Sequence, residues 1–140
     1  MLSNLLGSVN WLQVFVATLA YFMLGAIWYS LLFQKPWIRH HKIDVADPEM
    51  KKSAGVIMAF SFVLFFLITL GLAILIQRLN LQGGWRSGIK IGSFTGFFFS
   101  ALSISATYLY LNKNKALHAI EGLYHIVGQI IAAVILCSWR

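Results

Sequence analysis

Residues 60–70 read FSFVLFFLITL, a run in which only Ser61 and Thr69 carry polar side chains. The run lies inside a longer apolar segment, about 53–76, that contains no charged residue. Such a segment is typical of a transmembrane helix, because about 20 residues at the helical rise are needed to cross the hydrocarbon core of a bilayer. The sequence therefore predicts that this segment spans a membrane.

Three further segments are also long and mainly apolar, at about 11–33, 85–111 and 116–139. The whole chain is 59% hydrophobic and only 11% charged, with a mean hydropathy of +0.77. Soluble domains carry about 25% charged residues, so this composition does not suit a water-exposed surface. We expect residues 1–140 to form one all-α integral membrane bundle of four transmembrane helices. The short connections predict that the last three helices pack as antiparallel neighbours.

The 11 Lys and Arg residues outnumber the 4 Asp and Glu residues, and most of them lie between the apolar segments. This placement indicates topology and contact with lipid headgroups, and we expect no nucleic-acid partner. One end of the bundle would carry Lys35, Arg39, Lys42, Lys51, Lys52, Lys113 and Lys115. The other end would carry Arg78, Arg86, Arg140 and, if it is counted, Lys90. The richer end is expected to be cytoplasmic. This puts loops 34–52 and 112–115 inside and both termini outside the cell inner (plasma) membrane.

Aromatic residues recur near the expected ends of the spans, where amphipathic rings anchor helices at the membrane surface. The predicted interface anchors are Trp11, Trp28, Tyr29, Trp37, Trp85 and Trp139. The alternative for Trp28, Tyr29 and Trp37 is that they line an inner vestibule beside Glu121. Asn10 is expected to cap the first helix, with Gln13 as a capping-box partner.

Small residues recur every four positions in the third span, at Gly88, Gly92, Gly96 and Ser100. Such a ridge lets another helix backbone approach closely, so we expect helix packing there and near Gly25. The ridge could also serve oligomerisation. The alternative is a pore lining, to which a stripe of hydroxyl groups would belong: Ser93, Ser100, Ser103 and Thr107.

Polar residues in the fourth span follow steps of three, four and four, so that they share one helix face. We predict a polar intramembrane site formed by His118, Glu121, His125 and Gln129, with Ser103 and Thr107. A carboxylate at depth must face protein, pair with another group or be protonated. Two interpretations stay open, which are hydrogen-bonded structural packing and the handling of protons or ions. No metal site or cofactor is predicted, because the other acidic residues cluster around one loop.

The stretch from Gly25 to Trp37, GAIWYSLLFQKPW, resembles the signature of an uncharacterised bacterial family of small four-helix membrane proteins. This family is a domain of unknown function, of DUF 1761 type. Asn10-Trp11 and Glu121-Gly122-Leu123-Tyr124 are also similar to it. The resemblance implies a four-helix membrane fold over nearly the whole chain. It implies no activity, substrate or catalytic residue.

Two classes of function fit these features. We favour a structural or accessory membrane subunit, or a homo-oligomer, that acts through helix packing. The alternative is a small transporter or channel that moves protons, ions or a small solute past Glu121, His125 and Gln129. An enzyme is the weakest interpretation, and no catalytic residue is predicted.

Overall fold

The computed structural model describes residues 2–32 and 48–139, with side chains for 2–30 and 53–139. The predicted anchor Trp37 and the cations Lys35, Arg39 and Lys42 lie outside the described residues. Every regular element of the described part is helical. The elements are α1 (Leu2–Gly7), α2 (Trp11–Ile27), η1 (Trp28–Leu32), α4 (Pro48–Arg78), α5 (Trp85–Thr95), η2 (Gly96–Ala101), α6 (Leu102–Tyr110) and α7 (Lys115–Ser138).

Four helical segments are long and apolar enough to cross a membrane: Trp11–Ser30, Ser53–Arg78, Trp85–Tyr110 and Lys115–Ser138. They coincide with the four predicted spans, so the prediction of an all-α multi-pass membrane protein is confirmed. The third span is one continuous helical stretch in which η2, a π-helical turn, joins α5 to α6. A second π-helical turn, η1, ends the first span. Neither turn was predicted, and neither was α1.

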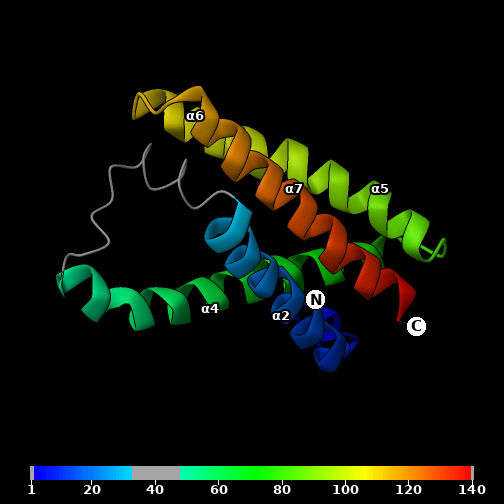
Figure 1. Cartoon of the computed structure of the whole chain (residues 1–140). Helices are drawn as coiled ribbons and strands as arrows, with labels where there is room; N and C mark the ends of the chain where they lie inside the picture. The colour runs from blue at the N-terminus through cyan, green and yellow to red at the C-terminus, as the bar shows by residue number, and fades with distance from the viewer. Residues whose placement is uncertain (1, 33–47, 140) are drawn as a thin grey trace.

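The first transmembrane helix begins at a side-chain cap. The Asn10 side chain accepts hydrogen bonds from the backbone N–H groups of Leu12 and Gln13, at 3.1 and 3.3 Å, as predicted for an N-cap. The prediction that Gln13 completes a capping box with Asn10 was wrong. The Gln13 side chain instead donates a hydrogen bond to the backbone carbonyl of Trp139. This bond ties the start of α2 to the end of α7. Both ends of the described chain lie at the same end of the bundle (Figure 1).

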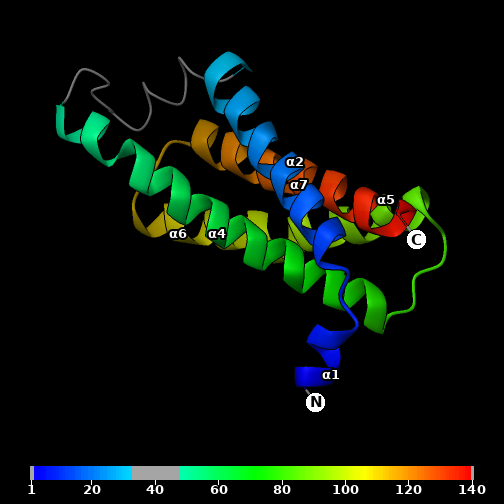
Figure 2. The same ribbon diagram turned by 90° about the horizontal axis from the view of Figure 1, so that it is seen from below.

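Helix α7 is the central element of the bundle. It packs along the α5–η2–α6 span on one side and against α2 and α4 on the other, as Figures 1 and 2 show. Half of its apolar window is buried, whereas 22% is buried in both Ser53–Arg78 and Trp11–Ser30. Ser53–Arg78 and Trp11–Ser30 are therefore the two least buried spans of the bundle.

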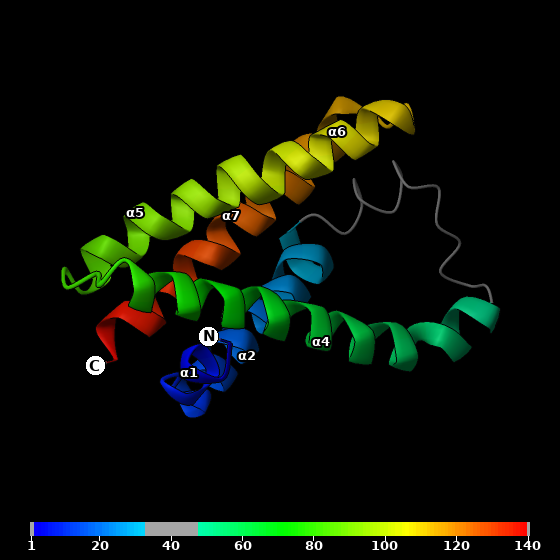
Figure 3. The ribbon, with the colours of Figure 1, turned by 180° about the vertical axis from the view of Figure 1, so that it is seen from behind.

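Helix α4 packs against α2 and α7. The expected neighbour packing of α4 against the third span was wrong, because the two helices meet at the 79–84 connection and diverge towards the other end (Figures 1 and 3). A physical reason lies in the glycines. Ideal Cβ atoms at Gly55 and Gly71 of α4 would meet nothing within 4 Å, so these glycines make no close helix contact. Helix α5 turns its own glycines towards α7.

Three glycines of α5 and η2, here called the glycine ridge, lie directly against the backbone of α7. An ideal Cβ at Gly88 would lie 2.5 Å from the Cα of Val134, and one at Gly92 would lie 2.5 Å from that of Ile130. At Gly96 the nearest atom is the Cα of Ile126, at 2.6 Å. Each step of four along the ridge is matched by a step of four back along α7. The ridge is therefore covered within one chain.

The glycine ridge predicts a sharp difference between two Gly→Leu substitutions. We expect Gly92→Leu to destabilise the folded protein by about 3 kcal/mol, because a side chain there overlaps the α7 backbone and forces the helices apart. Gly71→Leu, at an exposed glycine with no neighbour within 4 Å, is the matched control and should change stability little. Unfolding in mild detergent measures both. Equal stability of the two variants would contradict this packing.

Candidate functional site

Two ionisable residues of the polar row on α7, Glu121 and His125, bond to tyrosines of the first span. The hydroxyl of Tyr29, in η1, donates to Glu121 Oε2 at 2.6 Å. The hydroxyl of Tyr21, in α2, lies 2.5 Å from His125 Nδ1. Glu121 and His125 are both half-buried. The first span thus supplies one phenol to each polar side chain, at successive turns of α7.

Tyr21 and Tyr124 form a reciprocal contact with glycines of the opposite helix. An ideal Cβ at Gly25 would lie 2.8 Å from the hydroxyl oxygen of Tyr124, and one at Gly128 would lie 2.6 Å from the Tyr21 ring. Each helix therefore carries a tyrosine followed four residues later by the glycine that makes room for the other tyrosine. The Tyr124 hydroxyl also donates to the Tyr21 carbonyl at 3.0 Å. We call this arrangement the tyrosine–glycine lock.

Other aromatic rings surround the lock. Phe65 of α4 stacks on Tyr21 with ring centroids 4.8 Å apart. The rings of Tyr29 and His125 lie edge-on to Tyr124, at 5.1 and 4.9 Å. Aromatic pairs at these distances contribute about 0.5–1.5 kcal/mol beyond the area they bury. Tyr29, Phe65 and Tyr124 also line a cavity of about 200 Å³ between α2 and α4.

The π-helical turn η1 places both of its aromatic residues towards α7. The Trp28 indole donates to the carbonyl of Ile120 at 3.2 Å, beside the Tyr29–Glu121 bond. Single π-helical turns often occur at functional sites, because they change the direction of neighbouring side chains. Among the predicted interface anchors, Trp28 and Tyr29 are half-buried, whereas Trp11, Trp85 and Trp139 are exposed.

The second π-helical turn, η2, provides the hydrogen-bond partner of the last residue in the polar row. Gln129 is 3% exposed, and its side-chain amide donates to the Ser100 hydroxyl at 2.5 Å. An unsatisfied amide inside a bilayer would cost several kcal/mol, of the order of 4–8 by transfer to hydrocarbon. Ser100 therefore gives a deeply buried polar group its partner, and the partner comes from the helix that carries the glycine ridge.

The remaining members of the predicted site lie elsewhere. The His118 ring contacts Tyr108 at 5.7 Å and lines a separate surface groove between α6 and α7. Ser103 and Thr107 are exposed, and their hydroxyls donate back to their own helix, to the carbonyls of Phe99 and Ser103. The structure thus brings together Glu121, His125 and Gln129 with Ser100, and it leaves His118, Ser103 and Thr107 apart.

The side chains of the site do not form a recognisable metal-binding set in the described part of the chain, where no three His, Cys, Asp or Glu residues come together. Cys137 is a buried residue near the end of α7. What the site offers chemically is a carboxylate and an imidazole one helical turn apart, each bonded to a phenol.

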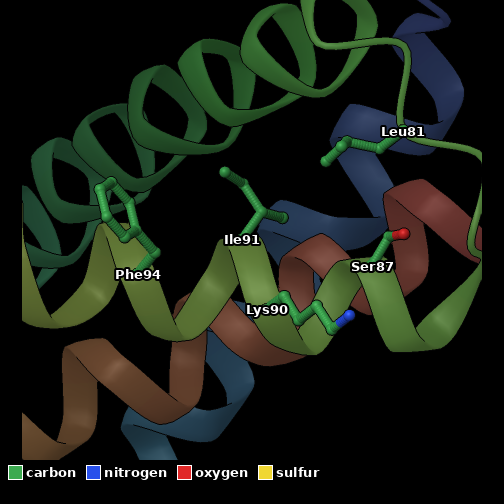
Figure 4. A pocket seen from close by; sticks show the side chains of 5 residues that line it. All are labelled: Leu81, Ser87, Lys90, Ile91 and Phe94. Carbon is green, nitrogen blue, oxygen red and sulfur yellow. The ribbon is translucent and has the colours of Figure 1, made fainter.

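A second cavity lies where α4 and α5 diverge. It measures about 340 Å³ and is lined by Leu81, Ile91 and Phe94, with Ser87 and Lys90. Figure 4 shows Leu81, Ile91 and Phe94 directed towards the space between the two helices. Lys90 is exposed, and its ammonium group makes no hydrogen bond or ion pair with the residues that the structure describes. This crevice does not connect the residues of the α7 row.

Tyr21, Tyr124 and Gly128 were not predicted to be members of the site. A signal for them is present, because Tyr21 precedes Gly25 by four residues and Tyr124 precedes Gly128 by four. The same spacing on two helices that run in opposite directions permits a reciprocal contact. It identifies the pair only when both helices are known to be neighbours.

The fold and site define a small multi-pass membrane protein in which polar side chains join a central helix to its neighbours. The family model described as "Protein of unknown function (DUF1761)" matches residues 12–137. The chain belongs to this family, which confirms the resemblance found in the sequence. No curated protein and no solved structure matches the chain.

The bond between Tyr21 and His125 predicts measurable coupling across two helices. In a double-mutant cycle of Tyr21→Phe and His125→Ala, we expect an interaction free energy of about 1 kcal/mol between the two sites. This value lies within the range measured for hydrogen bonds between membrane helices. Denaturant titration in mild detergent measures the four unfolding free energies. Tyr110→Phe, at a residue that is 93% exposed, serves as the control. Strictly additive losses would show that the bond does not join the helices.

Proposed function

We propose that this protein is a structural or accessory membrane subunit that acts through helix packing, as a homo-oligomer or within a larger membrane complex. One observation carries the proposal. Glu121, His125 and Gln129 each bond to a side chain of another helix. Polar groups satisfied in this way fix which helices pack together and in which register, which is the task of a scaffold.

The dimensions of α4 support an accessory role. The helix has 31 residues, so its length is ~46 Å at a rise of ~1.5 Å per residue. The hydrocarbon core of a bilayer is only ~30 Å thick. The helix therefore extends beyond the lipid core and offers a surface at the membrane boundary. Its central part exposes large apolar side chains, among them Phe60, Leu64 and Leu67. A partner helix or a second copy can pack there without disturbing the interior of the bundle.

A second candidate function is favoured by a different observation. Glu121 and His125 lie one turn apart, and each bonds to a tyrosine hydroxyl that carries an exchangeable proton. Such a row could pass protons or small cations, and intramembrane ionisable residues are common in relays of this kind. Four helices enclose little volume, so a path of this kind would run between subunits.

Proton flux across liposomes separates the two functions. We expect liposomes with wild-type protein to hold an imposed pH gradient as long as empty liposomes do, and Glu121→Gln to behave in the same way. Chemical cross-linking in native membranes should then give a defined complex. If the wild-type protein dissipates the gradient and Glu121→Gln stops the flux, the scaffold proposal fails and the transport function replaces it.

The orientation of the protein is also proposed. Lys51, Lys52, Lys113 and Lys115 belong to the end opposite the termini, and the positive-inside rule makes that end cytoplasmic. Both termini would then face outward from the cell inner (plasma) membrane. A phosphatase fused after Arg140 should be active, and a fluorescent protein that matures only in the cytoplasm should stay dark there. The reverse pattern would overturn this orientation.

A further inference from the structure

A groove of about 420 Å³ lies on the surface between η2, α6 and α7, away from the contacts with Tyr21 and Tyr29. Small residues shape its floor, because Ala101 and Gly122 touch closely, with an ideal Gly122 Cβ 3.3 Å from the Ala101 Cβ. The exposed side chains of Leu102 and Leu123 border it. The groove is open to the surrounding membrane.

The polar groups of this groove gather at one end. Lys115 and His118 lie in the first turn of α7, and Ser105 of the antiparallel α6 lies at a similar level. The remaining lining, from Ala119 to Ile126, is apolar along α7. The groove is therefore cationic and hydrogen-bonding at the membrane surface, and hydrocarbon-like below it.

The length of the groove matches one leaflet of a bilayer. From Lys115 to Ile126, helix α7 rises ~16 Å at ~1.5 Å per residue. Half of the ~30 Å hydrocarbon core is ~15 Å. A lipid whose phosphate lies at Lys115 would have a chain that reaches Ile126 near the middle of the membrane.

The lysines at the cationic end of the groove have no acidic counter-ion among the residues that the structure describes. Lys113 lies in the connection that precedes α7, and Lys115 is exposed at its first position. Glu121, the carboxylate nearest in sequence, does not line the groove and bonds to Tyr29. The charge of the groove is complementary to an anionic group.

We propose that this groove binds one phospholipid with an anionic headgroup. Its acyl chain lies along α7 over Ala119 and Gly122, and its phosphate accepts hydrogen bonds from Lys115, His118 and Ser105. The change from cationic to apolar along the groove fits an amphiphile of leaflet length, whereas a transmembrane helix of a partner would be apolar throughout. Basic pockets between membrane helices commonly bind such headgroups.

Native mass spectrometry of the full-length protein, released from bilayers with equal phosphatidylglycerol and phosphatidylcholine, tests this proposal. We expect the wild type to retain one phosphatidylglycerol in preference to phosphatidylcholine. Lys115→Gln should lower this preference about fivefold, the effect of one surface cation on an anionic lipid. Ala119→Phe, which fills the groove at an exposed residue, should reduce the retention of both lipids.

Lys90→Gln is the matched control, because Lys90 is an exposed lysine that lines the other membrane-facing crevice. It should leave lipid retention unchanged. Equal retention of both lipids by the wild type would overturn the proposal, and so would an equal loss in Lys90→Gln. If Ala119→Phe alters the oligomeric state and leaves lipid retention unchanged, the groove is an interface between protein chains and the proposal fails.

Discussion

The close approach of two helix backbones to α7 is the constraint on which the rest of the bundle depends. Within a bilayer, lipid tails are as apolar as leucine, so helices gain little by hiding apolar side chains from their surroundings. Association depends instead on dense van der Waals contact, which requires small residues where backbones meet. The glycine ridge provides this contact on one side of α7, and the tyrosine–glycine lock provides it on the other.

The polar side chains follow from this arrangement. Once α7 is held between two neighbours, Glu121, His125 and Gln129 each lie within hydrogen-bonding distance of a side chain on another helix. The partners come from η1, α2 and η2, and no buried side-chain nitrogen or oxygen among the described residues is left without one. The two π-helical turns occur at Tyr29 and Ser100, the residues that must reach across to α7. Local irregularity of the backbone thus coincides with the bonds that fix the helix register.

Much of the fold could be predicted from the sequence, because the length and hydropathy of a segment alone decide whether it can span a bilayer. The ridge of Gly88, Gly92 and Gly96 was also visible, since a spacing of four repeats one helix face. Hydropathy carries no information about which spans pack together, so the divergence of α4 from α5 was not predicted. Hydropathy also could not show that His118 and Glu121, three residues apart, face different neighbours. His118 lies towards α6, whereas Glu121 faces Tyr29.

The roles of Tyr21 and of the turn η1 depend on contacts between residues about a hundred positions apart, and the role of η2 depends on a contact between residues 29 positions apart. Spacing within one helix does not reveal such contacts. The central claim, that the glycine ridge lies against the α7 backbone, is tested most directly in a bilayer. Solid-state NMR of carbon-labelled protein in liposomes can detect a cross-peak between the Cα atoms of Gly92 and Ile130. The structure predicts a strong cross-peak at short mixing time. Its absence, with both residues assigned as helical, would contradict the account.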